Sequence, residues 1–374
     1  MRASAYVTMT ADTHVTLKLL LKRGALLAAA NWPTIAIQFV AEVTFQVLLA
    51  VPIIGAAILV AVLLGGDLAE MLQGSMRDIF TTIAGTLTAE PVALVAFMTA
   101  FSIVLVGGSV LMFLVKAGTV DVLVAAEAAS GPIEREPLTY ETTIRSASHF
   151  TLQRFMDGCG RLFHRYLALG AALTVVYAVS VGGYLAFVIY GYRAAGGRFL
   201  IIGWTFVAAL AAALLVAWIT LVNCAYLLLQ IAMAVDDVGL FQACRAVARF
   251  IRAEFRDLAG VFGVILALVV AATLASALAW SGVGLIAFVP LVGLAVFPLQ
   301  LAALLVRGLV FEYIGLTALV AYGTLYHRHV AARGSVADRG RAVTEPNGPR
   351  DTEPWAAETP GRGDRLLSIS LTGA

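Results

Sequence analysis

The sequence predicts an all-α protein, a polytopic membrane helix bundle with six transmembrane helices in three pairs, each pair preceded by a basic amphipathic interfacial helix. Composition is the first observation behind this prediction. Hydrophobic residues make up 61% of the 374 residues and charged residues 13%, whereas charged residues alone reach about a quarter of an ordinary soluble protein. The second observation is a set of long apolar stretches, and the third is a one-sided distribution of arginines.

The chain divides into three parts. We expect residues 1–31 to form a cytoplasmic interfacial helix, because leucines recur there at helical spacing. Residues 32–329 would form the six-span membrane domain. Residues 330–374 mix arginines with acidic residues, Gly and Pro without apolar periodicity, so they are predicted to be a disordered cytoplasmic tail. The expected spans are about 34–64, 92–115, 167–190, 199–229, 259–280 and 299–326, each close to the length that crosses about 30 Å of hydrocarbon.

Basic amphipathic segments precede the three pairs of spans, at about residues 15–31, 144–165 and 240–258. In the third segment the predicted apolar face carries Cys244, Val247, Ile251 and Phe255. The stretch from Glu127 to Glu141 breaks the hydrophobic pattern with glycine, prolines and charges, and is predicted to be an exposed loop.

The last apolar block needs an interruption. From Gly284 to Tyr326 a straight helix would be about 65 Å long, roughly twice the hydrocarbon thickness. Pro290 and Pro298 are the expected break points, since proline removes a backbone donor. Either 284–297 is a re-entrant or interfacial piece before a sixth span, or 284–306 is a span and 308–326 a seventh.

Basic residues favour six spans. Six spans place 21 of the 25 Lys and Arg residues in inner segments and 3 in outer segments, with Arg307 inside the last block. Because cytoplasmic segments of membrane proteins are enriched in Lys and Arg, both termini are expected to be cytoplasmic. The arginine-rich composition indicates a bacterial protein, and the expected location is therefore the bacterial inner membrane.

The sequence contains no motif for enzymatic chemistry. We find no HExxH, no G-x-S-x-G, no P-loop and no His/Cys cluster with metal-ligand spacing. No catalytic residue, cofactor or metal is therefore expected, and we predict that the protein is not an enzyme. Nucleic-acid binding is not expected either, because the arginines lie at span ends rather than on one basic face.

Charged residues within the spans are the candidate site, because a buried charge in a membrane is costly. The line Gln38, Glu42 and Gln46 has the four-residue spacing of one helix face, and Glu312 is expected at a similar depth to Glu42. One interpretation is a polar clamp between helices, and the other is a protonatable or substrate-contacting centre. The full predicted polar centre is Gln38, Glu42, Gln46, Arg307 and Glu312. The predicted contacts to anionic lipid are Arg154, Arg161, Arg165, Arg245, Arg249, Arg252 and Arg256.

The arrangement of three span pairs, each entered through a basic helix, with a last span ending in Leu325-Tyr-His-Arg328, loosely resembles poorly characterised bacterial six-span proteins. That group includes the membrane domain fused to some glycerophosphodiester phosphodiesterases. The resemblance would cover about residues 15–330, and it implies a fold and a membrane location without an activity. The soluble phosphodiesterase barrel is absent from this sequence.

Two classes of function remain open at this point. The first is a membrane scaffold or accessory subunit, with anionic lipids and a protein bound through the tail as partners. The alternative is a permease for a small molecule or lipid that uses Glu42, Arg307 and Glu312. An intramembrane enzyme is a second alternative without a positive signal.

Overall fold

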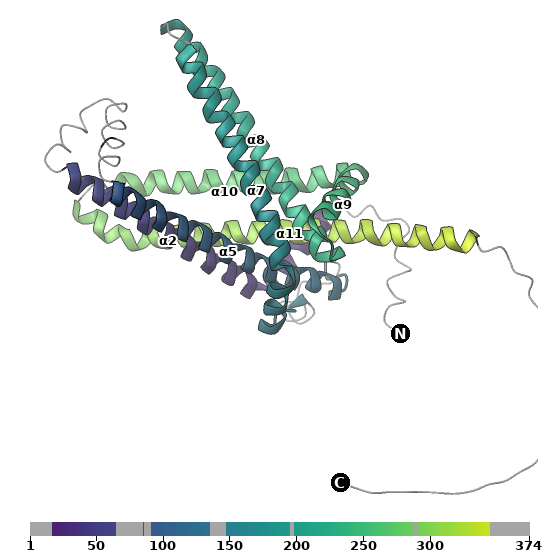
Figure 1. Ribbon diagram of the computed structural model, residues 1–374. Helices are drawn as coiled ribbons and strands as arrows, with labels where there is room; N and C mark the ends of the chain where they lie inside the picture. Colours follow the sequence, from purple (N-terminus) through teal and green to yellow (C-terminus); the bar gives the residue numbers. More distant parts are fainter. Residues whose placement is uncertain are drawn as a thin grey trace, which may run out of the picture. The chain divides into compact units, whose positions relative to one another are not determined.

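The computed structural model describes residues 17–64, 85, 91–134, 147–194, 198–287 and 290–344. Among these residues the long elements are all α-helices and none forms a strand. In chain order they are α1 (Leu17–Ala30), α2 (Trp32–Leu64), α5 (Pro91–Ala129), α7 (Leu152–Ala194), α8 (Arg198–Asp236), α9 (Leu240–Ala253), α10 (Phe255–Ala287) and α11 (Pro290–Thr344) (Figure 1).

Six of the described helices, α2, α5, α7, α8, α10 and α11, are long and apolar enough to cross a membrane. This confirms the predicted helical class and the number of apolar spans within the described residues. The candidate spans are Trp32–Ala56, Leu94–Ala129, Leu152–Ala194, Ile202–Asp236, Phe255–Ser281 and Pro298–Gly334.

The second and third spans differ from the expected boundaries. We expected the second to end near Lys116 and an exposed loop to begin at Glu127, but α5 continues to Ala129, and Glu127 and Glu134 are buried. The physical reason is that charged side chains in this stretch meet partners on other helices, so they do not end the helix. Similarly, the basic segment that starts at Leu152 is continuous with the third span in α7.

The last apolar block is one helix in the described residues. α11 begins at Pro290, where proline costs no intrahelical hydrogen bond, and passes through Pro298 without ending. Gly308, the expected start of a seventh span, lies inside this helix. α11 also continues to Thr344, well beyond the expected end of the last span near Tyr326. Residues 331–344 therefore are helical, whereas the remainder of the predicted disordered tail lies outside the described residues.

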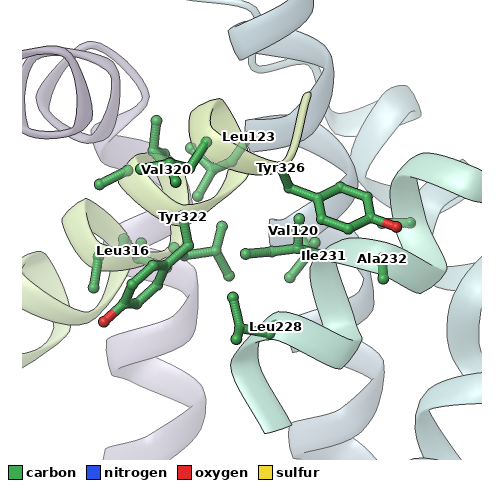
Figure 2. Close-up of a cluster of buried hydrophobic side chains, with 14 of the residues drawn as sticks. Val120, Leu123, Leu228, Ile231, Ala232, Leu316, Val320, Tyr322 and Tyr326 are labelled. Atoms are coloured by element: carbon green, nitrogen blue, oxygen red, sulfur yellow. The ribbon is translucent and has the colours of Figure 1, made fainter. Parts of the chain in front are cut away.

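The buried core of the described residues lies between Leu17 and Val330. α5 contacts α1, α2, α7 and α8. Figure 2 shows the buried cluster in which α5, α8 and α11 meet, with Val120, Leu123, Leu228, Ile231, Leu316 and Val320 among its members. Tyr166 of α7 is fully buried, and its hydroxyl donates to the Gln230 carbonyl of α8 at 2.9 Å. Packing of this kind matters because lipid tails are as apolar as the helices, and hydrophobicity alone does not drive helices together there.

α1 is packed against other helices and is not simply a surface element. Leu27 and Ala28 are fully buried. Gly24 allows the backbones of α1 and α11 to approach closely, since a Cβ atom at this position would lie 2.6 Å from the carbonyl oxygen of Thr317.

We predict that Gly24→Ala destabilises the protein by about 1–3 kcal/mol, because the added methyl group overlaps a backbone oxygen that cannot rotate away. Gly263→Ala is the matched control. A Cβ atom at Gly263 in α10 meets nothing within 4 Å, so this variant should gain about 0.5–1 kcal/mol from better helix propensity. The measurement is the thermal unfolding midpoint in detergent. Equal midpoints for the two variants would show that the α1–α11 approach is not tight.

Candidate functional site

Three charged residues from three different spans form the polar centre. Glu42 lies on α2, Lys116 on α5 and Glu312 on α11. The Glu312 side chain faces the side chains of Glu42 and Gln38 and the charge of Lys116. Lys116 in turn interacts electrostatically with both carboxyl groups. The centre therefore joins three helices that are far apart in the sequence.

The composition of this centre allows it to be electrically neutral. Two facing carboxyl groups can share one proton, because a protonated carboxyl is a donor and a carboxylate an acceptor. One protonated carboxyl, one carboxylate and one ammonium group sum to zero charge. A neutral cluster avoids most of the cost of placing an isolated charge in a medium of low dielectric constant. Gln38 is buried and adds a further amide donor.

Lys116 is the member that sequence reasoning missed. The expected second span, 92–115, ended directly before Lys116, yet this residue lies in the interior of α5. Its ammonium group also lies 5.6 Å from the ring centroid of Tyr226 on α8. The available signal was the sequence after Lys116, which stays apolar for several turns and so predicts that the helix continues.

Two residues of the predicted centre are exposed: Gln46 borders the centre, and Arg307 lies away from it. Gln46 donates to the Glu42 carboxylate at 3.1 Å, but it is exposed one turn away from the buried contact. Arg307 is exposed and stacks over the Phe311 ring, with 5.6 Å between the guanidinium carbon and the ring centroid. Five residues separate Arg307 from Glu312, which places them about 140° apart around a helix. The two side chains therefore cannot face the same neighbours.

A second ionic cluster fixes the end of α5. The Arg23 guanidinium donates to the carbonyl oxygens of Glu127, Ser130 and Gly131 at 3.1, 3.1 and 2.8 Å. It also pairs with the Glu134 and Glu127 carboxylates at 3.0 and 3.5 Å. Carbonyl groups at a helix C-terminus lack intrahelical partners and carry partial negative charge, so a buried arginine is well suited to cap them. This role was not predicted, because residues 1–31 were expected to form an interfacial helix, which would not bury an arginine.

A third cluster uses two of the arginines that were predicted to contact lipid. Arg161 pairs with Asp121 of α5 and, at 3.3 Å, with Asp237, while Arg165 pairs with Asp237 at 2.6 Å. Donation from Arg165 holds the pKa of the Asp237 carboxyl below its usual value. Since the folded-state pKa is lowered, this contact stabilises the protein at neutral pH and the contribution is lost on acidification. These arginines are thus engaged with carboxylates of the same chain.

The remaining predicted lipid contacts are exposed arginines. Arg154 lies near the start of α7, Arg245, Arg249 and Arg252 lie on α9, and Arg256 lies in the first turn of α10. The buried face of α9 overlaps the predicted one in part: Val247 is buried and Ile251 packs against the core, as predicted. Phe250 is fully buried instead of Cys244, which is exposed, and Phe255 is exposed at the start of α10. The apolar positions on α9 cover more than one face, so periodicity alone did not identify the side that packs on the protein.

Within the described residues, no group of three or more His, Cys, Asp or Glu side chains is placed to hold a metal ion. The structure thus adds no metal candidate to the three ionic clusters. Comparison of the chain with protein-family models, curated proteins and solved structures finds no match. The resemblance to bacterial six-span proteins therefore stays a prediction.

We predict that Glu42→Leu lowers the unfolding midpoint, because it removes one half of the carboxyl pair and leaves Glu312 with one partner fewer. The expected loss is about 1–3 kcal/mol, the typical cost of an unsatisfied buried polar group. Glu42→Gln keeps the shape and supplies its own amide donor to Glu312, so it should unfold close to the wild type. Gln46→Leu, one turn away on the same helix, is the matched control and should not destabilise.

The same variants separate a clamp from a transport centre. In a proton-coupled permease, Glu42→Gln would keep the fold and lose uptake, because an amide cannot exchange a proton. Wild-type stability and wild-type uptake in Glu42→Leu would show that Glu42 has neither role.

Proposed function

We propose that this chain is an integral protein of the bacterial inner membrane without enzymatic activity, acting as a membrane scaffold or accessory subunit with both termini in the cytoplasm. The supporting observation is that charged groups brought together from different helices pair with one another. Glu42 and Glu312 face Lys116, and Arg23 is bound by the end of α5. Groups satisfied in this way hold helices together.

We also propose that the spans are organised as three pairs, each preceded by a basic amphipathic segment. α1 precedes α2, the first turns of α7 form the second segment, and α9 precedes α10. α9 supports this most directly. Its buried face carries Ala243, Val247 and Phe250, whereas Phe241 is 85% exposed beside exposed arginines. A helix with an exposed aromatic residue and an arginine-rich side suits the interface of an anionic membrane.

Replacing Arg245, Arg249, Arg252 and Arg256 together with Gln should reduce the anionic lipid bound to the protein. Each basic residue near an anionic surface contributes about 1 kcal/mol before screening. The four-Lys variant keeps the charge and is the matched control. The measurement is retained phosphatidylglycerol in native mass spectra, and equal retention in the Gln variant and the wild type would defeat the interfacial role of α9.

A permease is the second candidate. The specific observation in its favour is that Glu42 and Glu312 face each other next to Lys116 inside the spans. Two carboxyls that share a proton are a site at which proton uptake can change the charge of a membrane interior. The Glu42 variants described above distinguish this function from a scaffold.

The scaffold proposal predicts a protein partner that depends on the C-terminal segment. Tagged full-length protein, purified from its own membrane, should retain a partner in fixed stoichiometry, and deletion of 345–374 should abolish that partner while leaving the membrane domain intact. A reporter active only in the cytoplasm, fused after Ala374, controls for orientation. Substrate uptake that survives this deletion and is lost in Glu42→Gln would contradict the scaffold proposal.

A further inference from the structure

A groove of about 330 Å³ lies between α10 and α11, and none of the three charged residues of the polar centre lines it. Its α10 side carries Ala272, Ala275 and Ala279, whose spacing places them on one helix face. From Ala272 to Trp280 the groove extends over about two helical turns, or about 12 Å. Small side chains on such a face allow a further helix to approach closely, which is how helices associate within membranes.

The outer part of α10 has little protein around it. Beyond Val261, no described residue of α10 is buried. Leu268, Leu274 and Leu278 are 46%, 60% and 74% exposed. The alanine face of α10 is therefore open to a neighbour from outside the chain.

Arg307 lines the groove from α11 and lies midway along this helix pair. It is 17 residues, or about 25 Å, from Pro290 at the start of α11. α11 runs back alongside α10 (Figure 1), so Arg307 is level with Ala272, which is 17 residues after the start of α10 and 15 before its end. Arginines near helix ends can extend to the interface, but Arg307 is far from both ends.

The positive charge of Arg307 has no counter-charge within the described residues. Its described interaction is the stacking contact with Phe311, and no described carboxylate pairs with it. Ser276 and Gln300 also line the groove, but both are neutral. A guanidinium group has five donors, and inside a membrane it needs an anionic acceptor.

We propose that this groove binds a transmembrane helix of a partner protein that carries an Asp or Glu near its midpoint, with this carboxylate on the Arg307 guanidinium and the helix backbone close to the alanine face. The inference rests on the proposed role as an accessory subunit and specifies the chemistry of the partner. Depth and charge select this occupant. Lipid phosphates lie outside the hydrocarbon layer, and the mid-span carboxyl groups of this chain, Glu42 and Glu312, already face Lys116.

The test uses a dye-labelled Leu/Ala helix of about 20 residues with one Glu at its centre, and a matched peptide with Gln at that position. Each is titrated against the full-length protein in phosphatidylcholine bilayers. The wild type should bind the Glu peptide about tenfold more tightly, as expected for one charge-assisted contact. Arg307→Gln should abolish this preference. Arg193→Gln removes an exposed arginine near the end of α7 and should keep it.

Two further variants separate recognition from folding. Arg307→Glu should reverse the selectivity, so that a peptide with a central Arg binds more tightly than the Glu peptide, and a merely structural role of Arg307 would not give this reversal. Ala303→Leu fills the groove from α11. It should weaken the binding of both original peptides, while the unfolding midpoint stays close to that of the wild type.

Equal binding of the Glu and Gln peptides by the wild type overturns the inference, as does tighter binding of a peptide whose Glu lies at one end. A dimer that dissociates in Arg307→Gln, without any peptide preference in the wild type, assigns the groove to a second copy and likewise overturns it. The scaffold proposal is tested separately by deletion of 345–374. A partner that survives this deletion contradicts the scaffold proposal and leaves the peptide preference unaffected.

Discussion

A charge inside a bilayer must find its counter-charge within the protein or at the membrane interface, and this constraint accounts for much of the structure. The centre formed by Glu42, Lys116 and Glu312 satisfies this constraint by bringing three helices together. The charges of the three side chains are therefore neutralised only when the helices associate. Arg23 satisfies the constraint differently, by binding the carbonyl groups that end α5. In both cases the requirement for a partner determines which helices contact one another.

Close backbone approach complements these polar contacts. Gly24 lets α1 reach the Thr317 carbonyl of α11, and Gly158 leaves room for Asp121, whose carboxylate then pairs with Arg161. Small residues at helix contacts are effective in membranes, since packing and hydrogen bonding replace the hydrophobic driving force of water. The ionic clusters therefore depend on glycine positions that carry no charge themselves.

Charged residues that lie outside these ionic clusters are the candidates for functional contacts. The arginines of α9 and Arg307 are exposed; those of α9 lie before the start of α10, whereas Arg307 lies inside α11. Exposed arginines next to aromatic residues are well matched to lipid headgroups at an interface. The paired interior and the exposed arginines of α9 together favour a protein that contacts the membrane surface through α9 and has its spans clamped by ionic clusters.

The sequence by itself determined the helical class and the number of long apolar spans, because span length follows from the thickness of the hydrocarbon layer. The four-residue line of Gln38, Glu42 and Gln46 placed those residues on one face, since helical periodicity is a local property. The tertiary structure decided which face of α9 is buried, that Lys116 belongs to the polar centre, and that Glu127 and Glu134 bind Arg23 instead of lying in an exposed loop. The separation of Arg307 from Glu312, by contrast, follows from helical periodicity alone. The other outcomes depend on residues more than seventy positions apart, and charge and periodicity in one segment carry no information about which distant segment supplies the partner.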